Sequence, residues 1–176
     1  MSSNKARMDT AVEFLKTEYN TLRTGRAHPA QIEYLSVKAF DSKYPLREVA
    51  TISVRAPQVL VVNPSEESLV DEVMKTLQAA DMNLTPRVEG TFVVVQFPKP
   101  SQEARQELIR QAGKKAEQAR TVVRGVRNDA VKEIKELVAS RDESFRFQKD
   151  LQQMHDQAIE QINKLLAAKE KEIASS

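Results

Sequence analysis

The 176-residue sequence contains no cysteine and no tryptophan, only four glycines, and only 5% aromatic residues. Without cysteine the chain can form no disulfide, no thiolate nucleophile and no cysteine-based metal site. The scarcity of glycine and of aromatic residues, beside 30% charged residues, favours long helices over a turn-rich β sandwich.

Long apolar runs are missing as well. No segment approaches the roughly 20 apolar residues that cross a bilayer, and the start of the chain lacks the apolar core of a signal peptide. We therefore expect a soluble, intracellular protein with no membrane partner. The net charge of +2 is small, so a nucleic-acid partner has to be argued from where the charges lie.

Catalytic motifs are equally scarce. The sequence has no glycine-rich phosphate loop, no motif around a serine nucleophile and no histidine pair at metal-ligand spacing. Its two histidines, His28 and His155, are far apart in the chain. We expect a protein that is not an enzyme and has no metal site and no cofactor.

Three segments, residues 4–24, 101–139 and 143–173, show helical periodicity. Their apolar residues recur at steps of three and four, which places them on one stripe of a helix. These stripes are Met8, Val12, Leu15, Tyr19 and Leu22; then Ala104, Leu108, Ala112, Ala116, Ala119, Val123, Val126, Ala130, Ile134 and Leu137; then Phe147, Leu151, Met154, Ala158, Ile162 and Leu165. The pattern predicts an elongated three-helix bundle built from residues 1–28 and 100–176.

The middle of the chain has a different pattern. Alternation and turn residues predict strands at 35–39, 49–54, 59–62 and 92–97, and an amphipathic helix at 66–80 with Ser65 as its N-cap. Asp41–Pro45 is predicted to be a turn, and Pro86 and Gly90 are predicted to mark further turns. The predicted fold is therefore α+β, with a small α/β domain at residues 29–99 inserted into the bundle.

Prolines mark both connections between these two domains. His28-Pro29 and Lys99-Pro100 lie in two short connecting segments. A domain joined to its neighbour only by two such segments can swing relative to it. We interpret His28, Pro29, Lys99 and Pro100 as a hinge. Just before it, Gly25 ends the first helix, with Arg23 and Arg26 on either side. These two arginines either stabilise the end of the helix, or contact phosphate or brace the two domains.

Basic residues gather on the second long helix. Arg120, Arg124 and Arg127 lie at positions i, i+4 and i+7, within an arc of about 60° at about 100° per residue. Arg110, Lys114 and Lys115 precede them, and Glu117 is the one acidic residue in this segment. One interpretation is a solvated flank with weak ion pairs to Glu117. The other is a phosphate-binding face for folded RNA, because a planar guanidinium suits bidentate phosphate contacts.

Several short stretches resemble one known family, the ribosome recycling factors. The stretches are Arg23-Thr24-Gly25-Arg26-Ala27-His28-Pro29, Tyr44-Pro45-Leu46, Met82-Asn83-Leu84-Thr85-Pro86, Ala116-Glu117-Gln118-Ala119-Arg120 and Val123-Arg124-Gly125-Val126-Arg127. The resemblance covers nearly the whole chain, in order. It implies an L-shaped molecule that resembles a transfer RNA, with a three-helix-bundle domain I and an inserted domain II.

The resemblance also implies a function. Domain I is expected to bind large-subunit ribosomal RNA at the intersubunit face, near the peptidyl-transferase region and the central bridge. Elongation factor G with GTP then separates the subunits through movement of domain II, and messenger and transfer RNA are released. Arg127 matches the most critical RNA-contacting arginine, with Arg124 and Arg120 beside it, and the protein is expected to be a monomer. The alternative is a structural adaptor whose apolar seams bind partner helices.

Some positions depart from the family pattern. Gly113-Lys114-Lys115 stands where bacterial members usually have an arginine, and Arg127-Asn128 stands where they usually have two arginines. Residues 56–63 and 82–91 resemble mitochondrial members more closely than bacterial ones. A location in the mitochondrial matrix is therefore expected, with the bacterial cytoplasm as the alternative.

Overall fold

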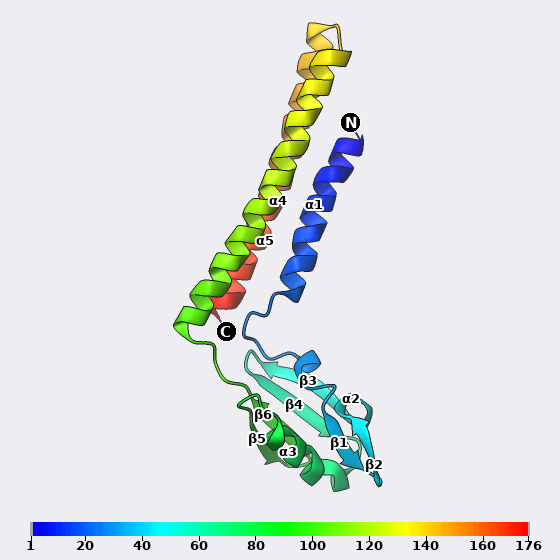
Figure 1. Cartoon of the computed structure of the whole chain (residues 1–176), viewed down its shortest axis with the longest axis vertical. Coiled ribbons are helices and arrows are strands. Elements are labelled where there is room, and N and C mark those ends of the chain that lie inside the picture. The colour runs from blue at the N-terminus through cyan, green and yellow to red at the C-terminus, as the bar shows by residue number, and fades with distance from the viewer. Residues whose placement is uncertain (1, 176) are drawn as a thin grey trace. The chain divides into compact units, whose positions relative to one another are not determined.

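The computed structural model describes residues 2–175, which form two compact units (Figure 1). The first unit joins the chain up to Thr24 with Gln102–Ala174, and the second contains Gly25–Ser101 together with Ser175. The predicted domain boundaries lie at residues 28 and 100, whereas the chain passes between the units after Thr24 and after Ser101. The predicted α+β class, with a small domain inserted into a helical one, is confirmed.

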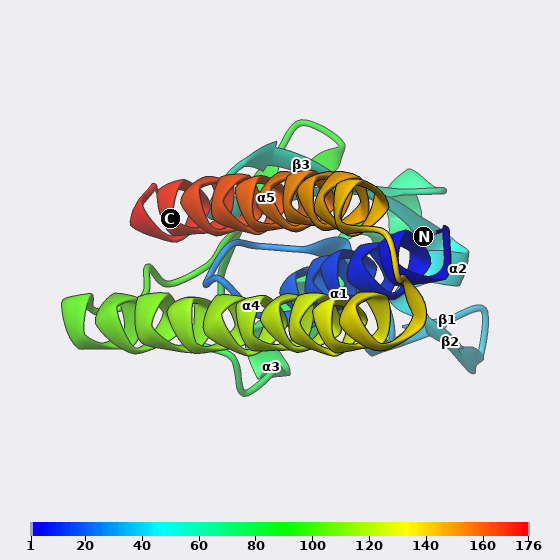
Figure 2. The same cartoon turned by 90° about the horizontal axis from the view of Figure 1, so that it is seen from above.

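The first unit is a bundle of three helices, α1 (Ser2–Thr21), α4 (Gln102–Leu137) and α5 (Arg141–Ala174). Each helix packs against the other two, as the view from above shows (Figure 2). The predicted stripes supply the core, because apolar side chains from one face of each helix are removed from water together. The fully buried members include Met8, Leu15, Val123, Leu151 and Ile162.

The ends of the helices differ from the prediction. The first helix was predicted to reach residue 24 and ends at Thr21. Leu137 and Ala104 were predicted to lie in the buried stripe, but both are exposed, Leu137 to 80%. Only α4 and α5 extend past the start of α1 (Figure 1), so no third helix covers Leu137, and Ala104 lies in the first turn of α4.

The second unit contains a four-stranded antiparallel sheet in the order β3-β4-β6-β5, and a separate β1-β2 hairpin. In chain order its elements are a 3-10 turn at Pro29–Gln31, β1 (Ser36–Ala39), β2 (Ser42–Pro45), α2 (Leu46–Val49), β3 (Ala50–Ala56), β4 (Val59–Pro64), a 3-10 turn at Glu67–Leu69, α3 (Val70–Ala79), β5 (Thr85–Glu89) and β6 (Phe92–Gln96). Alternate residues of the central strands, such as Leu60, Val62 and Val93, form one buried cluster with Val73 and Leu77 of α3. This unit therefore has a core of its own.

Two strands and the short helix α2 were not predicted. The segment predicted as the turn Asp41–Pro45 contains strand β2, because the turn itself is only Phe40 and Asp41, both with positive φ. Strand β5 lies at the sheet edge with little burial, so it lacks the apolar alternation by which strands are recognised. Pro86 is tolerated there because an edge strand needs fewer hydrogen bonds.

The start of α3 also differs from the prediction. Ser65 was predicted as its N-cap, but a 3-10 turn precedes the helix. Glu66 and Leu69 occupy the two cap positions, and neither side chain makes a capping hydrogen bond. The extra turn moves the start of the α-helix to Val70.

Candidate nucleic-acid interface

Arg120 is held between two helices of the bundle. Its Nε and Nη2 donate to Asn163 Oδ1 on α5 at 3.1 and 2.8 Å, and its Nη1 donates to Glu117 Oε2 at 2.9 Å. Only 19% of the side chain is exposed. Because the donors are fixed from two sides, this guanidinium has one well-defined orientation.

Arg124 shares the same carboxylate. Its Nη1 donates to Glu117 Oε1 at 2.8 Å, so Glu117 bridges the two arginines. Hydrogen bonds from Arg124 and then from Arg120 hold the pKa of Glu117 below its usual value. Both side chains of the Arg124 pair are about half exposed, so water and salt screen the attraction between them. The predicted pairing with Glu117 is thus present, but it is easily exchanged for another anion.

Arg127 has different surroundings. Its Nη1 lies 3.5 Å from Nε2 of His155 on α5, and its Nη2 donates to Asn128 Oδ1 at 3.4 Å. Among residues 2–175 it has no carboxylate partner. Its positive charge is therefore not neutralised by an ion pair, unlike the charges of Arg120 and Arg124. We call the surface of α4 formed by Arg120, Arg124 and Arg127 the arginine face.

The three other basic residues predicted for the site are not brought together with the arginine face. Arg110 makes two hydrogen bonds to Glu107, at 2.9 and 2.7 Å, and these, with a further one from Gln111, lower the pKa of Glu107 to about 2. Lys115 lies about 140° around the helix from Arg120 and pairs with Glu18 on α1 at 3.1 Å. Lys114 is exposed and forms no ion pair within the described chain.

The residues predicted as a hinge lie in the second unit. His28 caps the 3-10 turn at Pro29–Gln31, since its Nδ1 accepts from the Ala30 N–H at 3.0 Å while Gln31 Oε1 accepts from the His28 N–H at 2.8 Å. Lys99 is exposed, and Pro100 lies against Gly25. His28 and Pro29 are therefore part of an ordered, capped turn.

Gly25 has a backbone that suits glycine alone. Its φ is +81°, and a Cβ placed there would lie 2.7 Å from Pro100 Cγ. Gln58 Nε2 donates to the Gly25 carbonyl at 2.8 Å, and the Ala27 N–H donates to the Pro57 carbonyl at 2.7 Å. The chain just after Thr24 is therefore fastened to the sheet unit.

The two arginines beside Gly25 do not support the end of the first helix. Helix α1 ends at Thr21 and has no basic residue in its last turn. Arg23 is exposed beyond it, and Arg26 Nη2 donates to Ser175 Oγ. Of the two interpretations of Arg23 and Arg26, stabilisation of the helix end is the one that this geometry disfavours.

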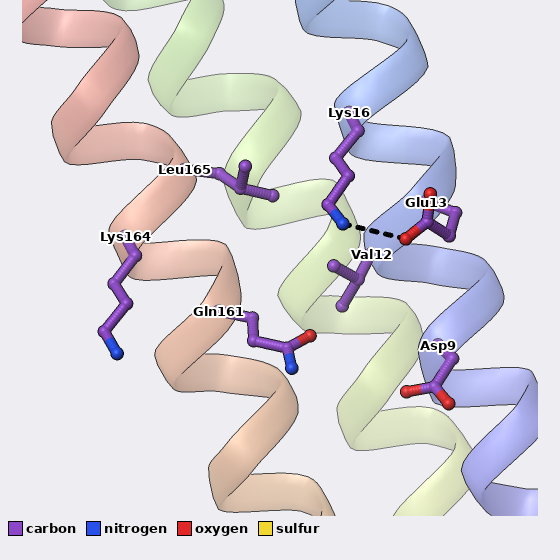
Figure 3. A pocket seen from close by; sticks show the side chains of 7 residues that line it. All are labelled: Asp9, Val12, Glu13, Lys16, Gln161, Lys164 and Leu165. Atoms are coloured by element: carbon purple, nitrogen blue, oxygen red, sulfur yellow. Dashed lines mark hydrogen bonds and ion pairs between the residues drawn. The ribbon is translucent and has the colours of Figure 1, made fainter.

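A groove of about 520 Å³ runs between α1 and α5 (Figure 3). Val12 and Leu165 supply its apolar surface, and its charged side chains are of both signs, with Lys16 and Glu13 paired at 2.8 Å. Mixed charges of this kind do not form a phosphate site.

Within residues 2–175 no group of three acidic, histidine or cysteine side chains is arranged to hold a metal ion. No helix in the same range is long and apolar enough to cross a membrane.

The apolar seams needed by the adaptor alternative are used inside the bundle. Met8, Val12, Leu15 and Tyr19 are all at most 3% exposed. Among the large apolar side chains exposed on this unit, Phe14, Val122 and Phe145 lie outside the predicted seams, and Leu137 is the last residue of one. Leu137 alone does not give a partner helix a continuous seam, because the central residues of the predicted seams are buried in the bundle.

Sequence reasoning missed the residues of α5 that orient the arginines. Asn163 and His155 lie 43 and 28 positions from the arginines that they contact. No local spacing reveals such pairs. The sequence showed only that both residues are polar and lie next to the apolar stripe of a helix predicted to pack against α4.

The model of the ribosome recycling factor family matches residues 15–174. The chain belongs to this family. Proteins called ribosome-recycling factor from Carboxydothermus hydrogenoformans and Bradyrhizobium sp. are 39% identical over 172 residues and 41% identical over 173 residues. These alignments cover 96% of this chain in both cases, and 93% and 92% of the respective relatives.

Solved structures of ribosome recycling factors are also similar to this chain. A solution structure of a ribosome recycling factor has a TM-score of 0.65 at 38% identity, covering 99% of this chain and 95% of that one. A second match, with a TM-score of 0.56, 30% identity and coverage of 98% and 95%, belongs to models of the T. thermophilus factor and E. coli elongation factor G bound to the E. coli post-termination complex. The relatives named here are bacterial, which fits the alternative of a bacterial cytoplasm and gives no support to a mitochondrial origin.

Proposed function

We propose that this protein binds the post-termination ribosome through large-subunit ribosomal RNA, with the arginine face as its anchor. Membership of the ribosome recycling factor family supports the ribosome as the partner. The charge distribution of α4 supports RNA as the molecule that is contacted. The protein acts by binding, without catalytic chemistry or a cofactor of its own.

The observation that carries this proposal is the state of Arg127. Its guanidinium is oriented by neighbours and forms no ion pair among the described residues, since Asp156 acts on it only through space, so a phosphate can contact it directly. Bidentate contacts between a guanidinium and phosphate are among the stronger hydrogen bonds in proteins. Arg120 and Arg124 add two guanidinium groups on the same side of the helix, whose shared Glu117 is displaced by the RNA.

Phosphate contacts of this kind recognise the backbone and the shape of folded RNA rather than its bases. Stacking on single-stranded bases would require aromatic side chains. The exposed large aromatic residues of the bundle, Phe14 and Phe145, lie on α1 and near the start of α5, and not on the helix that carries the arginine face.

The second part of the proposal is that elongation factor G with GTP acts on the bound protein to separate the subunits, after which messenger and transfer RNA leave. A similar structure comes from models that contain this elongation factor and the post-termination complex. The chain crosses between the compact units after Thr24 and after Ser101, and Thr24, Gly25 and Ser101 belong to neither a helix nor a strand. These two connections permit one unit to turn while the other stays bound. The bacterial relatives favour the bacterial cytoplasm as the place of action.

Subunit separation tests this proposal. Post-termination ribosomes are mixed with the protein, elongation factor G and GTP, and dissociation is followed by light scattering. We expect dissociation with the wild type, and normal ribosome binding but slower dissociation when Lys99 is deleted and one connection is shortened. Ribosomes that stay intact with the wild type would contradict the function, and normal dissociation by the deletion variant would contradict the role of the connections.

A further inference from the structure

His155 on α5 is a buried histidine with a complete set of polar neighbours. It is 8% exposed, and its Nδ1 lies 2.9 Å from Asp156 Oδ1 while its Nε2 lies 3.5 Å from Nη1 of Arg127. Gln152 Nε2 donates to the same Asp156 oxygen at 2.9 Å. The ring thus stands between the carboxylate of Asp156 and the guanidinium of Arg127.

The chemistry of these neighbours determines which ring nitrogen carries the proton. A guanidinium has donors only, so Nε2 has to be the acceptor and carry no hydrogen. An ionised carboxylate has acceptors only, so Nδ1 carries the hydrogen and donates it to Asp156. One neutral tautomer satisfies both contacts, and Gln152 Nε2, which also lies 3.5 Å from Nδ1, donates to Asp156 at the shorter distance of 2.9 Å. The hydrogen bond from His155 is also the main reason why the pKa of Asp156 lies below its usual value.

We propose that His155 is a positioning residue, which orients Arg127 for RNA without neutralising its charge. This inference rests on the proposed function. A carboxylate at the same place would hold Arg127 more firmly, but it would compete with phosphate, as Glu117 does at Arg120 and Arg124. A neutral imidazole supplies an acceptor and no charge. The fixed donor then loses less conformational freedom when RNA binds.

The proposal is tested with four variants and a double variant. They are His155→Ala, His155→Gln, Asp156→Ala, Arg127→Ala, and His155→Ala combined with Arg127→Ala. Affinity for post-termination ribosomes is measured at several salt concentrations. His155→Ala is expected to weaken binding about three- to tenfold, the factor that corresponds to one net hydrogen bond. His155→Gln, whose amide can accept from Arg127 and donate to Asp156, is expected to recover most of the affinity.

The double variant separates positioning from a general structural effect. If His155 acts through Arg127, His155→Ala has no further effect once Arg127 is alanine. If the two losses multiply instead, His155 acts in another way and the proposal is overturned. Asp156→Ala changes an exposed side chain, so folding is not at risk, and it is expected to weaken binding by a smaller factor because the tautomer is no longer held.

A measurement on the free protein keeps this test independent of the ribosome. The ¹⁵N NMR signal of the Arg127 side chain reports how ordered its guanidinium is. We expect an ordered signal in the wild type and in His155→Gln, and a mobile one in His155→Ala. An Arg127 signal that His155→Ala leaves unchanged would overturn the inference. One further outcome separates the two proposals. If the Arg127 guanidinium becomes mobile in His155→Ala while the wild type does not bind ribosomes, the positioning role is supported and only the proposed function is contradicted.

Discussion

Arg120 on α4 donates two hydrogen bonds to a single oxygen of Asn163 on α5, 43 residues further along the chain. The pair fixes a guanidinium at the junction of two helices before any partner arrives. Preorganisation of this kind strengthens binding, because less conformational freedom is lost in the complex. The arginine face is thus part of the bundle's packing as well as a charged surface.

Glu117 offers a direct test of competition for this face. Glu117→Gln keeps the shape of the side chain but removes the charge that pairs with Arg120 and Arg124. We expect ribosome affinity at low salt to rise, by up to about fivefold, because the exposed ion pairs that compete with RNA are weak. Glu160→Gln, which removes the partner of Lys164 on α5, is the control and should have no effect. Weaker binding by Glu117→Gln would mean that Glu117 orients the arginines instead of competing with RNA.

Gly113 provides a test by gain of binding. It lies seven residues before Arg120, within about 20° of it around the helix, and a Cβ there meets no atom within 4 Å. Gly113→Arg is expected to tighten ribosome binding and to steepen its salt dependence by about one phosphate contact. Gly113→Ala should only stabilise the helix, by about 0.5–1 kcal/mol, and leave the salt dependence unchanged. An unchanged slope for Gly113→Arg would place this end of α4 outside the RNA interface.

Tyr19 joins α1 to α4. Its hydroxyl donates to the Ala112 carbonyl at 2.7 Å, and Tyr19→Phe is expected to lower the free energy of unfolding by about 0.5–1.5 kcal/mol near neutral pH. The exposed Tyr34→Phe is the control, with an expected change within about 0.5 kcal/mol. Chemical denaturation followed by circular dichroism measures both.

The same tyrosine predicts a pH dependence. Burial raises the pKa of Tyr19 to about 12, whereas the unfolded chain has a value near 10. Above pH 10 the unfolded state loses the proton first, so the contribution of Tyr19 to stability is complete below pH 10 and is lost as the pH rises through about 12. Wild-type stability should therefore fall more steeply over this range than that of Tyr19→Phe. Parallel curves would contradict the buried position of the hydroxyl.

Gly25 and Gly90 form a matched pair for the connection between the units. Both have positive φ, but an added Cβ meets Pro100 at Gly25 and nothing within 4 Å at Gly90. Gly90→Ala is expected to cost about 1–2 kcal/mol, the strain of a left-handed residue, and Gly25→Ala is expected to cost more. Thermal unfolding measures both variants. Equal losses of stability would mean that the contact with Pro100 contributes nothing.

Periodicity was sufficient to predict the bundle from the sequence, because burial of one helix face leaves a regular pattern. Met8, Leu15 and Ile162 lie where their spacing placed them. Leu137 does not, since spacing cannot show that α1 is too short to cover it. Strand β5 was missed for a related reason, because an edge strand with little burial carries no alternation.

The candidate site was predictable only in part. The three arginines share one side of α4 because helix geometry alone requires it. Lys115 was grouped with them by its place in the sequence, yet it faces α1 and pairs with Glu18. The roles of His155 and Asn163 depend on how α5 packs against α4, and this packing is not visible in the local sequence.

Ribosome binding by the wild type and by Arg127→Ala, measured by co-sedimentation over a salt series, tests the central claim most directly. Arg55→Ala, which removes an arginine from the sheet unit, is the control. We predict that wild-type binding falls with salt, and that Arg127→Ala weakens it by about 1–3 kcal/mol and lowers the salt slope by about one contact, while Arg55→Ala binds as the wild type does. Arg127→Ala that binds like the wild type at every salt concentration would contradict the account of the arginine face as the RNA anchor.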